Sequence, residues 1–243
     1  MGSSAEVKIY RNPKKVAKAV ARELRNIFAE SSRPRFDIAL SGGNTPKKLL
    51  KLLAENYNES LPWNLIHFWW VDERCVAPDD NESNFRIAND LLFSQVLVPE
   101  QNIHRIRGEN NPEAEAERYS MEISENLEYS NDSPVFDLVI LGMGEDGHTA
   151  SIFPDRLELV NDKRICLATK HPVTGQNRIT LSGSVIKNAA RIFFMVTGEA
   201  KAPRISEIMN NEEAAKLLPA YYIEPENGIL IWFLDEPAAT KIK

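Results

Sequence analysis

Four clusters of polar residues and glycines each follow an apolar run of this 243-residue chain, at residues 41–46, 72–74, 142–148 and 198–201. A short apolar run bounded by glycines is typical of a buried strand. Open α/β sheets bind their ligands at the carboxyl ends of such strands. We therefore predict that the four clusters meet in one site.

The first cluster has the composition of an anion-binding loop. Gly42 and Gly43 let the backbone approach a ligand closely. Thr45 suits the N-cap of a helix and Pro46 its first position, so the helix that follows would direct its positive end and its N–H groups at the ligand. This favours a phosphate site, in which Asn44 also takes part. The alternative is a tight turn that only caps its helix.

The third cluster contains a carboxylate and an imidazole, Asp146 and His148, with one glycine between them. A carboxylate beside a histidine fixes its tautomer and raises its basicity, which is how a general base is built. A single histidine is more often structural, but this one follows a glycine-rich strand end. Second and third ligands at metal-binding spacing are absent from the sequence, so we predict no metal site.

The same cluster, residues 142–147, also matches the G-x-G-x-x-G pattern of dinucleotide-binding proteins, and Asp162 follows at about the expected 20 residues. Glu145 and Asp146 would place negative charge against a pyrophosphate, and Pro154 limits any helix that begins here. Asp162 also precedes the next expected strand instead of ending it. We therefore predict no nicotinamide cofactor.

Three cations accompany these clusters. Arg74 has a planar guanidinium group whose paired N–H donors suit a carboxylate, a phosphate or a developing oxyanion. Arg178 opens an expected strand and Lys201 an expected helix; each alone would be a solvated charge. The chain has 29 basic and 35 acidic residues, a net charge of −6. This balance argues against a nucleic-acid surface, so an anionic ligand needs such local cations.

The rest of the sequence alternates short strands with amphipathic helices, which predicts an α/β fold with a mostly parallel sheet covered on both faces. We expect one domain, residues 1–243, without a membrane span or signal peptide, and hence a cytoplasmic protein with two free cysteines. The expected strands are residues 36–40, 65–71, 136–141, 165–169, 178–181, 192–197 and 229–234. The expected helices cover residues 16–28, 47–57, 83–96, a segment opened by Asn111 and Pro112, and a segment from Lys201 that ends before Pro219.

Five strings resemble the 6-phosphogluconolactonase family, in the family's order and over roughly residues 38–203: LSGGNTPKKLL, FWWVDERCVAPDDNESNF, LVILGMGEDGHTASIFP, NRITLS and TGEAKA. Each string is moderately specific, whereas the ordered set is highly specific. The resemblance implies a three-layer, Rossmann-like α/β fold shared with glucosamine-6-phosphate deaminases. It also implies hydrolysis of 6-phosphoglucono-δ-lactone, a small phosphosugar lactone, without a cofactor.

The deaminases share two of these motifs but differ at two positions. They have a tyrosine where this chain has Arg74, and a glutamate that assists ring opening where this chain has Phe153. The resemblance therefore favours the lactonase over the deaminase. A third alternative, a non-catalytic sugar-phosphate sensor, is disfavoured because Asp146 and His148 are both present and no DNA-binding segment accompanies them.

With the family's chemistry in view, we expect His148 to activate water for attack on C1, with Asp146 orienting it and Arg74 contacting the lactone end. The loop amides of Gly144 and Gly147 are candidate oxyanion donors. The residues expected to hold the phosphate are Gly42, Gly43, Asn44, Thr45, Arg178 and Lys201. We expect a monomer or a weak homo-oligomer that binds neither nucleic acid nor membrane.

Overall fold

The structure is a computed structural model that describes residues 5–30, 33–225 and 227–242, apart from the side chain of Asn44. Its main sheet has seven strands, all parallel, in the order β1-β12-β11-β8-β2-β3-β5. The bounds are β1 Glu6–Tyr10, β2 Phe36–Leu40, β3 Ile66–Trp70, β5 Ile103–His104, β8 Leu138–Leu141, β11 Arg191–Val196 and β12 Ile229–Asp235.

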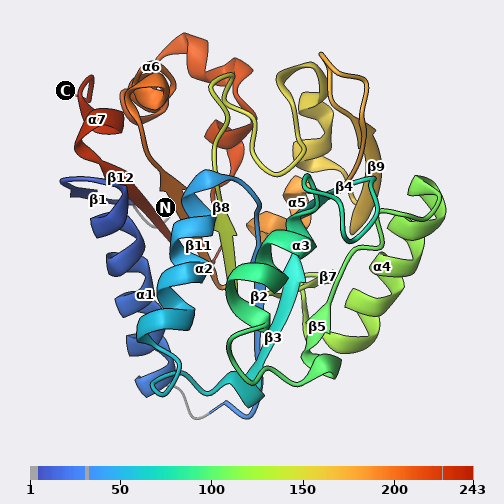
Figure 1. Cartoon of the computed structure of the whole chain (residues 1–243). Coiled ribbons are helices and arrows are strands. Elements are labelled where there is room, and N and C mark those ends of the chain that lie inside the picture. The colour runs from blue at the N-terminus through green and yellow to red at the C-terminus, as the bar shows by residue number, and fades with distance from the viewer. Residues whose placement is uncertain (1–4, 31–32, 226, 243) are drawn as a thin grey trace.

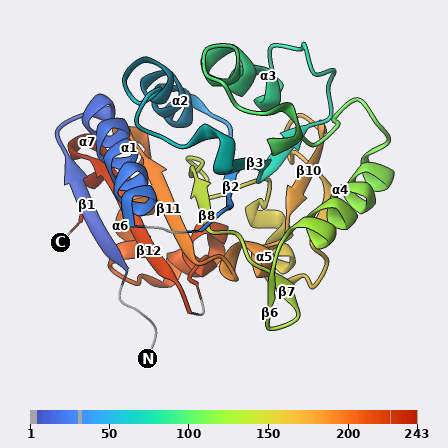
Figure 2. The ribbon, with the colours of Figure 1, turned by 90° about the horizontal axis from the view of Figure 1, so that it is seen from below.

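Helices cover both faces of this sheet, which is why its central strands are continuous apolar runs (Figures 1 and 2). On one face, α1 (Pro13–Glu30) and α2 (Asn44–Asn56) pack against each other, and α1 buries the stripe that contains Val16, Val20 and Leu24. On the other face lie α5 (Gly183–Lys187) and the segment of residues 199–222, which consists of helix α6 (Ala202–Met209) and short helical turns. The predicted three-layer, mostly parallel α/β fold is confirmed.

Two predicted strands lie outside the parallel sheet. β9 (Cys166–Lys170) and β10 (Asn177–Leu181) form an antiparallel hairpin, and β10 also pairs with β4 (Asp72–Arg74). The sequence prediction of a mostly parallel sheet assigned no pairing to these two strands; they are antiparallel because residues 171–176 are too few for a crossover, which takes a dozen or more. This small sheet stands beside the carboxyl ends of the main strands, at the upper right of Figure 1.

Helix α4 (Pro112–Asn126) packs on the small sheet and begins as the sequence predicted. The Asn111 side chain accepts a hydrogen bond from the Ala114 amide, and Pro112 occupies the first turn. Other described elements are α3 (Asn84–Ala88), α7 (Glu236–Ala239) and the short hairpin of β6 (Tyr129–Ser130) and β7 (Ser133–Pro134).

Some element bounds differ from the sequence prediction. The half-exposed edge strand β1 was not predicted at all, because its five residues lack a continuous apolar run. The helix expected over residues 83–96 ends as α3 at Ala88, and a π-helical turn over Asn89–Phe93 follows it. The helix α6 (Ala202–Met209), in contrast, starts next to Lys201 and ends before Pro219 as predicted, and Asn211, two residues after its end, adopts a φ of +52°. Within the described ranges, no helix combines the length and apolarity of a membrane span.

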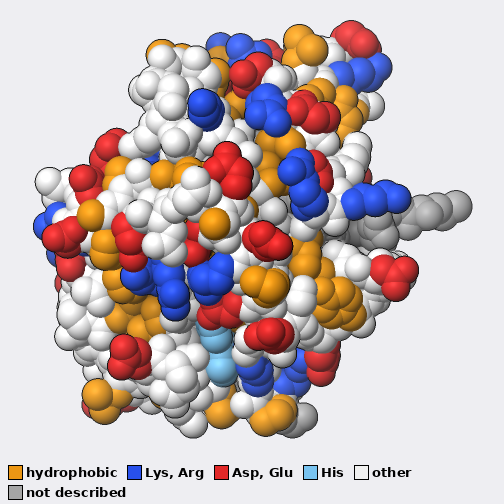
Figure 3. Space-filling view, turned by 90° about the vertical axis from the view of Figure 1, so that its right-hand side faces the viewer, with side chains coloured by type: hydrophobic (Ala, Val, Ile, Leu, Met, Phe, Trp, Pro, Cys, Tyr) orange, Lys and Arg blue, Asp and Glu red, His pale blue; other side chains and the backbone are white. Residues whose placement is uncertain are grey.

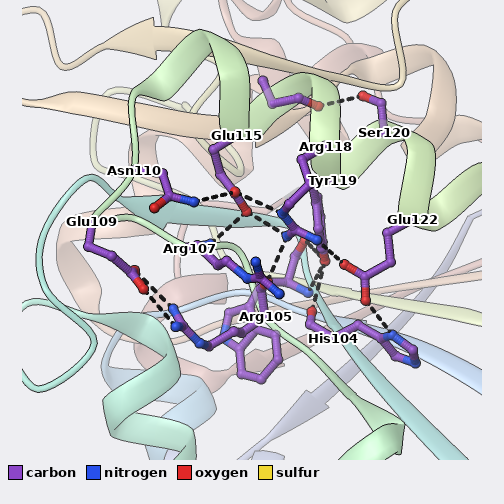
Figure 4. Close-up of polar contacts among 12 residues, drawn as sticks. His104, Arg105, Arg107, Glu109, Asn110, Glu115, Arg118, Tyr119, Ser120 and Glu122 are labelled. Atoms are coloured by element: carbon purple, nitrogen blue, oxygen red, sulfur yellow. Dashed lines mark hydrogen bonds and ion pairs between the residues drawn. The ribbon is translucent and has the colours of Figure 1, made fainter.

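The face that carries α4 mixes acidic and basic side chains (Figure 3), and a chain of polar contacts connects that surface to the buried His104 and the partly exposed His67. Arg118 bonds to Glu115 and Glu122, and the Glu122 carboxylate lies 2.8 Å from Nδ1 of His104 (Figure 4). Nε2 of His104 in turn lies 3.0 Å from Nδ1 of His67. Hydrogen bonding along this chain is satisfied when both imidazoles are neutral, with His67 donating to His104 and His104 to Glu122.

This arrangement predicts a loss of stability in acid. Burial, with the charge of Arg35 next, lowers the pKa of His67 to about 4, below the unfolded value of about 6.5. Between these pH values the unfolded chain binds more protons, so the free energy of unfolding should decrease as the pH falls from 6.5 to 4. We expect a loss of roughly 1–2 kcal/mol, since His67 is partly exposed. Urea unfolding at several pH values measures it.

His67→Asn is the matched variant, because its amide can still donate to His104 but does not titrate. The variant should show a flatter dependence of unfolding free energy on pH between 4 and 6.5. Equal slopes for the variant and the parent chain would assign the acid sensitivity to other groups.

Candidate active site

The four polar clusters do converge, around a cavity of about 580 Å³ at the carboxyl ends of β2, β3, β8 and β11. The predicted site residues that line it are Gly42, Gly43, Thr45, Arg74, Gly144, His148, Arg178 and Lys201. Asp146 lies beside His148 but does not line the cavity, and Gly147 does not line it either. The side chain of Asn44 lies outside the described residues, so its predicted contact with phosphate stays a prediction.

The loop after β2 presents bare backbone at the start of α2. The helix begins at Asn44, with Gly43 as N-cap at a φ of +105° and without a side-chain cap. The prediction of Thr45 as the cap was wrong: its Oγ1 lies 2.9 Å from Oγ1 of Thr197, which ties the loop to the end of β11. The Gly42 and Gly43 amides donate to no other residue that the structure describes. Uncapped amides at a helix N-terminus suit an anion.

His148 and Asp146 form a hydrogen-bonded pair. Nδ1 of His148 lies 2.6 Å from Oδ1 of Asp146, which also accepts a hydrogen bond of 3.1 Å from the His148 amide. Burial alone would raise the pKa of Asp146, but the hydrogen bond and charge of His148 outweigh it and lower this pKa to about 2. The carboxylate thus holds the proton on Nδ1 and leaves Nε2 as the basic nitrogen.

Gly144 leaves room for this pair. A Cβ atom at Gly144 would lie 2.2 Å from Nδ1 of His148 and 2.3 Å from Oδ1 of Asp146, so any side chain would displace one of them. The His148 ring also packs against Phe153, with 4.9 Å between ring centroids. Backbone and neighbouring ring therefore both fix the orientation of the imidazole.

The two candidate oxyanion donors are already engaged within this loop. The Gly144 amide donates to the carbonyl of His148 at 2.8 Å, and the Gly147 amide donates to the carbonyl of Gly144 at 3.2 Å. Both amides close turns within the loop in this structure, so their oxyanion role stays a prediction, and donors from other elements are the alternative.

Two guanidinium groups enter the cavity side by side. Arg74 on β4 and Arg178 on β10 are directly opposite in the antiparallel ladder, so their side chains share one face. Arg74 donates through Nη1 to the carbonyl of Glu82, but the buried Nε of each arginine has no hydrogen-bond partner among the described residues. Burial lowers the pKa of Arg178, and the charge of Arg74 lowers it further. Such a pair is stabilised by an anion.

Lys201 completes the positive side of the cavity. It belongs to the turn Glu199–Lys201 after β11. Gly198 caps this turn, and its amide donates to the buried carboxylate of Asp235 at 2.9 Å. Burial lowers the pKa of Lys201, although Glu145 and Asp146 oppose the shift. The Lys201 ammonium forms no ion pair or hydrogen bond within the described chain, so it is available to a ligand.

Sequence reasoning missed the roles of two acids next to Arg74. The carboxylate of Asp72 lines the cavity and accepts a hydrogen bond of 2.7 Å from Ser151. The buried carboxylate of Glu73 points the other way and accepts from the backbone at the start of α3, including the Asn84 amide at 2.8 Å. Burial raises the pKa of Glu73, although these amides oppose the shift. The sequence held one signal of these roles: side chains alternate along a strand, so the neighbours Asp72 and Glu73 point to opposite faces.

The family model described as glucosamine-6-phosphate isomerases/6-phosphogluconolactonase matches residues 11–232. The chain belongs to this family. A 6-phosphogluconolactonase of Aggregatibacter actinomycetemcomitans is 43% identical over 214 residues, which are 88% of this chain and 90% of that protein. One of Haemophilus influenzae is 43% identical over 213 residues, which are 87% of this chain and 89% of that protein.

The solved structures agree with this family. A 6-phosphogluconolactonase from Thermotoga maritima superimposes with a TM-score of 0.82 at 30% identity, over 96% of this chain and all of that one. Family membership therefore rests on both sequence and fold. Among the residues with described side chains, no group of three or more His, Cys, Asp or Glu is arranged to hold a metal ion.

Proposed function

We propose that this chain hydrolyses 6-phospho-D-glucono-1,5-lactone to 6-phospho-D-gluconate, with His148 as the general base. The observation that supports this best is one cavity that combines an oriented imidazole with Arg178 and Lys201, whose charged groups have no hydrogen-bond or ion-pair partner among the described residues. Similarity to proteins named 6-phosphogluconolactonase supports the same substrate.

The positive side of the cavity would hold the phosphate. The bare amides of Gly42 and Gly43 stand at the N-terminus of α2, and Arg178 and Lys201 supply charge. Arg74, opposite Arg178, would extend this contact toward the lactone ring. Local cations are needed because the chain as a whole has a net charge of −6.

His148 would then act on water. Nε2 takes a proton from a water molecule as the water oxygen attacks C1, while Asp146 stabilises the imidazolium that forms. When the bond between C1 and the ring oxygen breaks, the imidazolium returns its proton to that oxygen. The product is an open-chain carboxylic acid, which loses its proton to solvent to become the carboxylate, and the base is regenerated.

The alternatives lack a supporting observation. A deaminase needs a carboxylate where this chain has Phe153, and the Phe153 ring is buried against His148. A non-catalytic sensor does not require the hydrogen bond between Asp146 and His148. A single domain, a cytoplasmic location, weak or no self-association and lack of affinity for nucleic acid stay predictions.

The decisive experiment is hydrolysis of freshly generated 6-phosphoglucono-δ-lactone, coupled to a dehydrogenase and corrected for the spontaneous rate. Glucosamine 6-phosphate is assayed in parallel for release of ammonia. We expect lactone turnover without ammonia. Ammonia release would establish the deaminase instead, and inactivity on both substrates would favour a binding protein.

A further inference from the structure

A second histidine faces the cavity from the hairpin of β9 and β10. Thr169 is opposite Arg178 in this hairpin, and Arg178 is opposite Arg74. Side chains alternate along a strand, so His171, two residues after Thr169, emerges on the face that bears both arginines. His171 accordingly lines the cavity together with His148.

The turn that His171 begins fixes the protonation of its ring. Nδ1 accepts hydrogen bonds from the amides of Val173 at 3.2 Å and Thr174 at 3.3 Å. A nitrogen that accepts from amides bears no proton, so the proton of the neutral imidazole is on Nε2. Nε2 has no hydrogen-bond partner in the described part of the chain. The ring therefore offers one donor to a ligand.

The surroundings of His171 keep the imidazole neutral. Partial burial lowers its pKa, and the positive charges of Arg178 and Arg74 lower it further, against the opposing charge of Asp146. No acceptor in the described ranges bonds to Nε2, and a second proton on Nδ1 would repel the two turn amides. At neutral pH His171 is thus a neutral donor beside two arginines.

Phe153 sets the position of this donor relative to the base. The Phe153 ring lies 4.9 Å from the His148 ring and 5.0 Å from the His171 ring, measured between centroids. The two imidazoles thus flank one buried phenyl group at the same end of the cavity. The Gly144 and Gly147 amides donate to carbonyl groups of their own loop, so neither is a free donor for the reacting carbonyl.

The geometry points to His171 as a substrate-binding residue whose Nε2–H donates to the carbonyl oxygen at C1 of the lactone. This inference rests on the proposed function. When water adds to C1, that oxygen gains negative charge and the hydrogen bond strengthens, so the contact favours the transition state over the bound substrate. A neutral donor does this without adding a third positive charge beside Arg74 and Arg178.

Two substitutions separate this role from a structural one. In His171→Asn, the side-chain oxygen can accept from Val173 and Thr174 as Nδ1 does, but no donor reaches the position of Nε2. In His171→Gln, the longer amide presents a donor near the position of Nε2 and loses the acceptor for the turn. His67→Asn, a histidine variant outside the cavity, is the control.

We expect His171→Asn to fold with nearly unchanged thermal stability and to lose on the order of 10- to 100-fold in kcat with little change in KM. This is at or below the usual loss for one oxyanion donor, because a lactone is an activated ester. His171→Gln should regain much of kcat despite a lower thermal stability. His67→Asn should keep the parental kcat at neutral pH.

The opposite order, an active His171→Asn and an impaired His171→Gln, would overturn the inference and leave His171 a turn residue. Parental kcat in both variants would also overturn it. Both outcomes presuppose that the parent chain hydrolyses the lactone. If the parent chain is inactive on the lactone, it is the proposed function that fails, and the assay of the parent shows this before any variant is made.

Discussion

Replacing His148 with alanine is expected to lower kcat by about 10²- to 10⁴-fold, the usual contribution of a positioned general base. Nε2 is the basic nitrogen because Nδ1 is hydrogen-bonded to Asp146 at 2.6 Å. KM should change little, since the cations proposed to bind the phosphate belong to other elements: Arg178 to β10 and Lys201 to the turn after β11. The fold should persist because the His148 side chain is partly exposed.

The measurement is kcat and KM from the coupled assay, with spontaneous hydrolysis subtracted at each substrate concentration. Added imidazole should restore part of the rate of His148→Ala, because the missing side chain leaves a space beside Phe153. His67→Asn again serves as the control for loss of a histidine elsewhere. A loss of kcat with an equal rise in KM, or no response to imidazole, would contradict the assignment of the base.

The convergence of the site was predictable because it follows from parallel topology. In a parallel sheet all carboxyl ends lie on one edge, so clusters more than a hundred residues apart, such as those at Gly42 and His148, meet there. The pairing of Asp146 with His148 was predictable for a local reason: one intervening glycine keeps both side chains within hydrogen-bond reach.

Other features depend on contacts that spacing does not reveal. Arg74 and Arg178 are neighbours only because β4 pairs with β10 in an antiparallel sheet, and this register joins segments a hundred residues apart. The engagement of the Gly144 amide depends on how the loop folds back on the carbonyl of His148. Hydrogen-bond partners of a loop are set by its conformation, whereas composition indicates only which conformations are open to it.

His171 illustrates the same limit. In sequence it is one of four histidines, without a flanking motif. Its importance arises from the six-residue turn that orients its ring and from the buried Phe153 that separates it from His148. A short connection between two apolar runs was the one signal of this hairpin, and it indicates an antiparallel pair.

Lys201→Ala is expected to raise KM by about 10- to 100-fold while kcat changes little, because a hydrogen bond between charged groups contributes about 1.5–3 kcal/mol. The ammonium has no partner within the described residues, so the substitution removes a contact with ligand and breaks none within the protein. Inorganic phosphate should become a weaker inhibitor by a similar factor, since it would bind to the same cations.

The matched control is Lys216→Ala, an exposed lysine paired with Glu213 at 2.8 Å, which should leave both kinetic constants unchanged. The dependence of KM on salt distinguishes the local attraction by Lys201 from the field of the whole chain. The chain has a net charge of −6, so its overall field opposes an anionic substrate, and Lys201 counters this field only at short range. The KM of the parent should therefore rise with salt more steeply than that of Lys201→Ala. An unchanged KM in Lys201→Ala would contradict this role and leave the phosphate to Arg178 and the amides of Gly42 and Gly43.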